Sequence, residues 1–211
     1  MSSATREAGD PPERATPLGR PRDPALDRAI LAAARRLLIE HGYHGMSLQG
    51  VARQAGVHMP AIYRRWRTKA DLIISVVFPD ELEPLELPGD LRGDVRVFVE
   101  SSLREFADPA TRAATPGLMG EALVDPEIFD RLEERQALFA QGLLWVVDEA
   151  VKRGELKRRQ IKHLELLVPV LAGSAIFLEV RTKAPIDDAL IDGLTDFLLG
   201  GLGVATNAKR R

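Results

Sequence analysis

The stretch of sequence that decides the fold is SLQGVARQAGVHMPAIYRRWRTKADLIISVV, residues 47–77. Its residue types predict three short helices. Ser47 can cap the first helix, and Gly56 can end it in the left-handed conformation. A second helix over 59–66 has a basic end, and Thr68 followed by Asp71 is a capping-box variant that can open the third. Two short helices joined by a tight turn are typical of a helix-turn-helix, whose second helix enters the DNA major groove.

The sequence on both sides of this stretch predicts further helices. Upstream, Asp23 and Pro24 can start a helix, and an apolar stripe at helical spacing continues to Gly42. Downstream, 78–91 is typical of a linker, and helices are predicted over 91–106, 116–124, 125–153, 161–181 and 186–202. We therefore expect an all-α protein of about nine helices. A three-helix DNA-binding domain with a helix-turn-helix would precede a larger helical ligand-binding and dimerisation domain.

Charge is distributed unevenly along the chain. Residues 1–77 hold 12 Lys and Arg against 7 Asp and Glu, although the whole chain has a formal net charge of -2. A basic N-terminal part suggests anion binding, and an uneven scatter of surface charge is the alternative.

We expect a disordered arm over 1–22, a DNA-binding domain over 23–78, a ligand-binding and dimerisation domain over 79–205, and a disordered tail over 206–211. The arm could follow DNA or be a plain flexible tail.

Several functional classes find no support in the sequence. There are no cysteines, which excludes disulfides and Cys-ligated metal sites. Neither a signal peptide nor an apolar run long enough to span a bilayer is present, so we expect a cytoplasmic protein without membrane attachment. Glu121, Glu127 and Asp130 are ordinary charges for helix surfaces, and no catalytic triad order or phosphate-binding glycine loop accompanies them. We expect no enzymatic activity, no cofactor and no metal.

Residues 24–77 resemble the N-terminal domain of the TetR family of transcriptional repressors. The resemblance is carried by SLQGVARQAGV at 47–57, AIYRRW at 61–66, TKADL at 68–72 and the block at 33–42 that runs on into Tyr43. Residues 89–204 more loosely resemble the ligand-binding and dimerisation half of one subgroup, through GDLR at 89–92, DPE at 125–127 and RGEL at 153–156.

This resemblance implies roles for individual residues. Tyr63, Lys69 and Ser47 match positions that usually contact DNA phosphates. The turn and first turn of the recognition helix, where base contacts are usual, are His58, Met59, Pro60 and Ala61. This sequence departs from the family pattern at 58–60, because Pro60 has no N–H to donate and Met59 offers only apolar contact, as with a thymine methyl.

Three arginines near the recognition helix allow two interpretations. Arg64, Arg65 and Arg67 can contact phosphates or guanine. Alternatively, they form a solvated basic face or pair with Asp and Glu. Trp66 replaces a phenylalanine that is commoner in the family, and we expect it to lie in the core.

The last two helices are apolar on nearly every side, so more than one surface must cover them. The resemblance implies that they pair with the same helices of a second chain in a homodimer. The alternative is that they are only core of one chain. The expected interface residues are Leu164, Leu167, Leu171, Ala175, Leu178, Leu190, Leu194, Phe197 and Leu198.

An effector pocket is expected among the helices between 91 and 181. A largely apolar lining would suit a lipophilic or aromatic small molecule. The candidate lining residues are Phe98, Leu103, Phe106, Met119, Phe139, Leu143, Trp145 and Phe177.

The function predicted from all of this is a ligand-responsive DNA-binding transcriptional regulator. It would be a repressor that an unknown small molecule releases from a palindromic or near-palindromic double-stranded operator. An activator or a ligand-independent DNA binder is the first alternative. A helical enzyme is a distant one, and a helical protein–protein module would leave the basic stretch over 47–77 unexplained.

Overall fold

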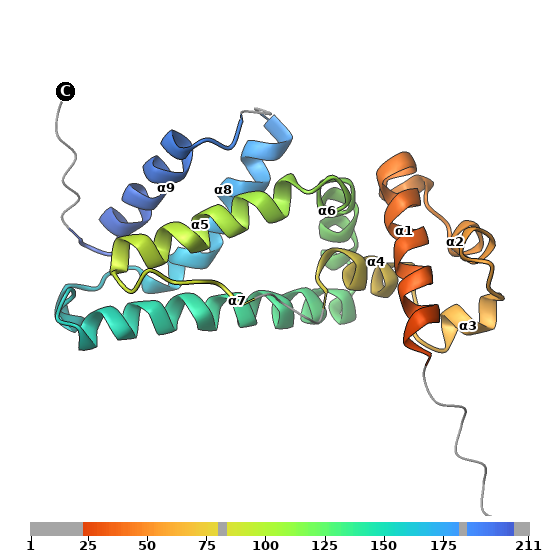
Figure 1. Cartoon of the computed structure of the whole chain (residues 1–211), viewed down its shortest axis with the longest axis horizontal. Helices are drawn as coiled ribbons and strands as arrows, with labels where there is room; N and C mark the ends of the chain where they lie inside the picture. Colours follow the sequence, from red (N-terminus) through yellow and green to blue (C-terminus); the bar gives the residue numbers. More distant parts are fainter. Residues whose placement is uncertain (1–22, 80–83, 182–184, 205–211) are drawn as a thin grey trace, which may run out of the picture.

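A computed structural model describes residues 23–79, 84–181 and 185–204, and every regular element in those ranges is a helix (Figure 1). This confirms the all-α prediction. The predicted N-terminal arm and C-terminal tail lie outside the described residues. Within the described ranges, no helix has both the length and the apolar character needed to cross a membrane. The helices are α1 (Pro24–Gly45), α2 (Leu48–Ala55), α3 (Met59–Tyr63), α4 (Lys69–Val77), α5 (Leu91–Ala107), α6 (Pro109–Ala122), α7 (Pro126–Lys152), α8 (Leu167–Arg181) and α9 (Asp188–Gly201).

The first four helices pack around one apolar core, which Ala114 and Leu118 of α6 also enter. Ile30, Leu38, Ile62 and Leu72 are all fully buried in it, so α1, α3 and α4 each contribute a large side chain. Val51 supplies the buried contact from α2. In Figure 1, α1, α2 and α3 form the outer end of the molecule, and α4 lies between them and the remaining helices.

The predicted caps of the helix-turn-helix are confirmed. The hydroxyl of Ser47 accepts a hydrogen bond from the Gly50 amide at 3.1 Å. Gly56 ends α2 with φ 67° and ψ 31°, the left-handed conformation that glycine adopts without strain. The Thr68 amide donates to the Asp71 carboxylate at 2.9 Å, and the Asp71 amide donates to the Thr68 hydroxyl at 3.0 Å. This reciprocal pair is a complete capping box.

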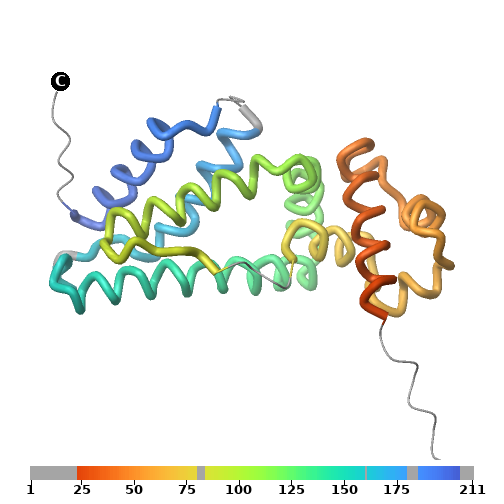
Figure 2. Tube along the Cα trace, in the orientation of Figure 1, coloured from red at the N-terminus to blue at the C-terminus, as the bar shows by residue number. Residues whose placement is uncertain are grey.

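The remaining helices form the body of the molecule. The tube in Figure 2 shows α7 as the long lower edge, with α5, α8 and α9 above it and α6 at the side facing α1. Val95, Val99, Val146 and Leu171 are fully buried in a second apolar core.

Four predicted helix boundaries differ from the structure by three residues or more. Helix α6 begins at Pro109, well before Pro116, because the Asp108 carboxylate accepts hydrogen bonds from the amides of Ala110 and Thr111. Pro116 therefore lies inside the helix, at the cost of one backbone hydrogen bond. Helix α3 already ends at Tyr63, and α8 begins only at Leu167, after the 3-10 turns Arg158–Gln160 and Leu164–Leu166. Helix α1 runs to Gly45, although φ of 68° at Gly42 interrupts it near the predicted end.

Two sequence motifs of the body meet at the start of α5. The Glu155 carboxylate accepts a hydrogen bond from the Leu91 amide at 2.8 Å. Arg153 donates to Glu155 at 2.5 Å and to Asp94 at 3.3 Å. Asp94 is buried and also accepts from the Gly89 amide at 2.8 Å. The segments 89–92 and 153–156 therefore fasten the start of α5 to the end of α7.

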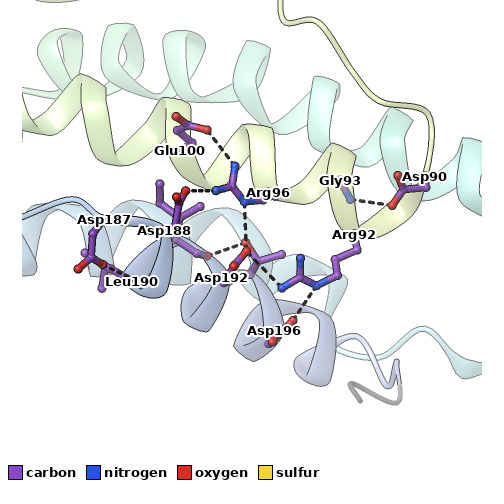
Figure 3. A network of polar contacts seen from close by, with 12 residues as sticks. Asp90, Arg92, Gly93, Arg96, Glu100, Asp187, Asp188, Leu190, Asp192 and Asp196 are labelled. Carbon is purple, nitrogen blue, oxygen red and sulfur yellow. Dashed lines mark hydrogen bonds and ion pairs between the residues drawn. The ribbon is translucent and has the colours of Figure 1, made fainter. Parts of the chain in front are cut away.

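A ladder of ion pairs holds α9 against α5 (Figure 3). Asp188, Asp192 and Asp196 are four residues apart, so one face of α9 presents all three. Arg92 reaches Asp192 at 3.2 Å and Asp196 at 3.1 Å. Arg96 reaches Asp192 at 3.1 Å and also pairs with Asp188. The hydrogen bond from Arg96 lowers the pKa of the Asp192 carboxyl below its ordinary value.

Candidate nucleic-acid interface

Helix α3, the predicted recognition helix, presents an exposed surface at one end of the molecule. His58 is its N-cap residue and makes no side-chain capping hydrogen bond. His58, Pro60 and Arg64 are exposed, and 53% of the Tyr63 surface is accessible. Because Pro60, Tyr63 and Arg64 are three or four residues apart, they share one face of the helix.

The opposite face of α3 is fixed in the core. Ile62 is fully buried, and Trp66, just beyond the helix, is buried as predicted. The Trp66 indole N–H donates to the Ser75 hydroxyl of α4 at 2.9 Å. Met59 and Ala61 are half-buried, and Met59 packs against the core of the domain. Of the predicted base-contact positions, His58 and Pro60 are therefore the more accessible.

Two predicted phosphate-contact residues already have partners within the chain. Ser47 accepts its capping hydrogen bond and keeps its hydroxyl proton for another acceptor. The Lys69 ammonium donates to the Tyr43 carbonyl at 3.1 Å and lies 4.3 Å from the centre of the Tyr43 ring. An ammonium has three N–H donors, so Lys69 can make this contact and still reach a phosphate.

The three arginines are placed differently. Arg64 is exposed. Arg65 is not on the open surface, because its side chain is only 8% exposed and pairs with Asp27 of α1. The structure thus favours the ion-pairing interpretation for Arg65, and we remove it from the candidate DNA contacts. No local pattern pointed to this pair, because Asp27 lies far from Arg65 in the sequence. Arg67 is 3.9 Å from Glu127 of α7 and largely exposed.

The end of the molecule formed by α1 to α4 is packed tightly against the body through Tyr43 and Gly117. A Cβ atom on Gly117 would lie only 2.2 Å from Cγ of Tyr43, so α6 approaches this ring as closely as its backbone allows. Burial and the neighbouring Glu121 carboxylate raise the pKa of the Tyr43 hydroxyl. Arg35 of α1 also pairs with Asp108 at the start of α6.

The predicted effector-pocket residues do not surround one cavity. Phe98, Leu103 and Leu143 are buried in the core of the body, and Phe139 meets Phe98 edge to face at 5.2 Å. In contrast, the side chains of Met119, Trp145 and Phe177 are largely exposed on three different helices. Phe106 lines a cavity of about 10 Å³ together with Arg112, Thr115, Ile176 and Glu179. That volume suits about one water molecule, which is too small for an effector.

The predicted interface residues fall into two groups. Leu167, Leu171, Ala175 and Leu198 are buried within the chain, so they offer little surface to a second copy. They face inward because α8 and α9 each bury one side against α5. Leu164 is half-buried and also packs against this core.

The outer side of α8 and α9 forms a groove of about 400 Å³. Four of the predicted interface residues line it, and so does Phe177, a residue that the sequence predicts for the effector pocket. The lining residues are Ser174, Phe177, Leu178, Ala189, Leu190, Gly193, Leu194 and Phe197.

Comparison with known families agrees with this geometry. A family model described as bacterial regulatory proteins, tetR family, matches residues 30–76. A second model, the C-terminal domain of tetracyclin repressor-like proteins, matches residues 87–198. The chain belongs to the TetR family. This TetR-family chain is therefore a DNA-binding transcriptional regulator with a helix-turn-helix, and the family is one of regulators rather than enzymes.

Individual relatives span nearly the whole chain. The DNA-binding transcriptional repressor TetR of Mycobacteroides abscessus is 31% identical over a 183-residue alignment that covers 81% of this chain and 90% of that protein. An HTH-type transcriptional regulator of Mycobacterium tuberculosis is 28% identical and covers 83% of this chain and 93% of its own length. A TetR transcription regulator from Haloarcula marismortui has the same fold, with a TM-score of 0.65 at 17% identity over 85% of this chain and 97% of that one.

Proposed function

We propose that this TetR-family regulator is a cytoplasmic homodimeric repressor that binds a near-palindromic operator and is released from it by a small molecule. The observation that carries the proposal is the exposed face of α3. His58, Pro60, Tyr63 and Arg64 are accessible there, while Ile62 fixes the opposite side of the helix. An α-helix supported in this way fits the major groove of B-DNA.

The proposed contacts follow from the chemistry of each side chain. The Tyr63 hydroxyl, the Ser47 hydroxyl and the Lys69 ammonium would donate to phosphates. Arg64, on the same exposed face as Tyr63, would neutralise a phosphate. The turn that contacts bases would consist of His58, Met59, Pro60 and Ala61. Because Met59 packs against the core, only part of its side chain would be free to contact a base.

The groove on α8 and α9 supports a homodimer. A second copy of the chain would cover the apolar side chains of Leu190, Leu194 and Phe197, which a single chain leaves at the surface. Two recognition helices held by such an interface would read half-sites about 34–36 Å apart, one turn of B-DNA.

Release by an effector requires that the effector bind better to the arrangement in which the two recognition helices no longer fit the operator. Helix α4 is the proposed lever, because it contacts α1 on one side and α6 and α7 on the other. The cavity beside Phe106 is too small for an effector, so binding at that place would have to enlarge it between α5, α6 and α8. An apolar effector agrees with the side chains that α5 and α8 contribute to the core of the body. The repressor role is supported by the related Mycobacteroides abscessus protein, which is named a repressor.

The proposal is tested by selecting bound duplexes from a random pool and placing the selected sequence upstream of a reporter gene. We expect a two-fold symmetric site and a reporter signal that falls when the protein is expressed. A signal that rises would establish an activator, and an asymmetric single half-site would contradict the dimer.

A further inference from the structure

An ion pair joins the end of the recognition helix to the first helix of the chain. The Arg65 guanidinium, just beyond α3, contacts the carboxylate of Asp27 in the first turn of α1. We propose that this pair is a tether that sets the orientation of α3, so that Arg65 positions the DNA-reading residues without touching DNA. The inference rests on the proposed role of α3 as the recognition helix.

Helix α3 needs such a contact because it is short. It has five residues, Met59–Tyr63, and an isolated helix of that length is unstable in water. Its N-cap residue, His58, makes no side-chain capping hydrogen bond. Ile62 and Trp66 pack against the core, and the Trp66 indole N–H donates one hydrogen bond to Ser75 of α4. The pair between Arg65 and Asp27 adds a second polar contact, which joins the same end of the helix to α1.

The surroundings of Arg65 give the pair direction and strength. Its side chain is 8% exposed and that of Asp27 is 28% exposed, so water screens their attraction only partly. The Nη1 atom of Arg65 also donates to the Ala61 carbonyl at 3.2 Å. That carbonyl belongs to the last turn of α3, where backbone oxygens lack partners within the helix. A planar guanidinium can hold both acceptors at once, which the point charge of a lysine cannot do in the same geometry.

Arg64 supplies a matched comparison. It is the same residue type, one position earlier, and it is exposed on the face of α3 that carries Tyr63. If both arginines touched phosphates, removing either would reduce the number of counterions released on binding. If Arg65 is a tether, only Arg64 has that property. The salt dependence of binding therefore separates the two roles.

The experiment measures the affinity of the full chain for two duplexes, the one it selects from a random pool and a scrambled version, over a series of salt concentrations. The variants are Arg65→Gln, Asp27→Asn, and the paired replacement Asp27→Leu with Arg65→Met, which fills the site without charge. Arg64→Gln and Glu40→Gln are the controls, since Glu40 is an exposed acid on the same helix as Asp27. Circular dichroism reports whether each variant is folded.

For the three tether variants, we expect the preference for the selected duplex over the scrambled one to fall about tenfold or more, as when a specific base contact is removed. The slope of log affinity against log salt should stay that of the wild-type protein. Arg64→Gln should lower the slope by roughly 0.9 for each phosphate that is no longer neutralised, and Glu40→Gln should change nothing.

Three results would overturn the tether. A reduced salt slope for Arg65→Gln would make Arg65 a phosphate contact. An equal loss of affinity for both duplexes at an unchanged slope would mean that the pair only stabilises the fold and does not orient α3. A folded Leu and Met double variant with full sequence preference would show that the charges are not needed. If the wild-type protein itself prefers no duplex, the proposed function of α3 fails, which is a separate outcome from failure of the variants.

Discussion

The carboxylate of Asp71 takes part in two structures at once, because one oxygen closes the capping box of α4 and the other pairs with Arg131 of α7. Asp71 is buried at this position. Asp71, which fixes the start of α4 directly after the proposed DNA-reading segment, is therefore also held by α7 of the body. A movement of α7 relative to α4 would change the contact between Arg131 and this carboxylate.

Replacing Arg131 tests how much its ion pair with Asp71 contributes to stability. In Arg131→Met, the buried Asp71 carboxylate loses its charged partner, and we expect the free energy of unfolding to fall by about 1–3 kcal/mol. Urea denaturation measures the change. Glu127→Gln is the control, because it removes only exposed pairs at 3.8 and 3.9 Å and should cost under about 1 kcal/mol. Equal losses in the two variants would mean that Asp71 does not depend on Arg131.

The close approach of α6 to Tyr43 predicts a strong effect of a single methyl group. Gly117→Ala would place a Cβ atom 2.2 Å from Cγ of Tyr43, and overpacking of this kind costs about 1–3 kcal/mol. Gly120→Ala on the same helix meets nothing within 4 Å and should stabilise the protein by roughly 0.5–1 kcal/mol. The two melting temperatures should therefore move in opposite directions. If both rose, the packing of α1 on α6 would be looser than described.

The ion-pair ladder between α5 and α9 predicts a pH dependence of known sign. The pKa of Asp192 is lowered in the folded protein, so its ionised form stabilises the fold above the ordinary carboxyl pKa of about 3.9. This contribution disappears as the pH falls through the lower folded value. Asp192→Asn should therefore melt below the wild-type protein at pH 7, and the gap should close in strong acid. A gap that stays constant across this range would exclude ionisation of Asp192 as its cause.

The apolar groove predicts which substitution separates the dimer. Phe197→Glu would place a carboxylate in the proposed interface, where its burial is unfavourable, and we expect a monomer in sedimentation equilibrium. Trp145→Glu changes another exposed aromatic residue, on α7 outside the groove, and should leave the dimer intact. The reverse pattern would place the interface on α7.

The parts of the structure that the sequence could predict are those controlled by local chemistry. Ser47, Gly56, Thr68 and Asp71 each perform the capping role expected from neighbouring residues. The start of α6 could also have been predicted, since Asp108 and Pro109 repeat the capping pattern with which Asp23 and Pro24 start α1. Pro116 carries a competing signal for a first helical residue, and the prediction that the helix begins there is wrong.

Features that depend on distant residues could not be predicted in the same way. Arg64 and Arg65 are equivalent by composition, and only the fold brings Asp27 to one of them. Likewise, α8 is apolar on nearly all sides, so its sequence does not distinguish Leu171, which faces the core, from Phe177, which faces the groove. Periodicity identifies a face only when the opposite face is polar.

The central claim is that the exposed face of α3 binds DNA, and the salt dependence of binding to the selected duplex tests it most directly. For Tyr63→Phe combined with Arg64→Gln, the affinity should fall through the loss of both contacts. The slope of log affinity against log salt should decrease by roughly 0.9, because Arg64 neutralises a phosphate whereas the Tyr63 hydroxyl is uncharged. An affinity and slope equal to those of the wild-type protein would contradict the claim, because α3 would then lie away from the DNA.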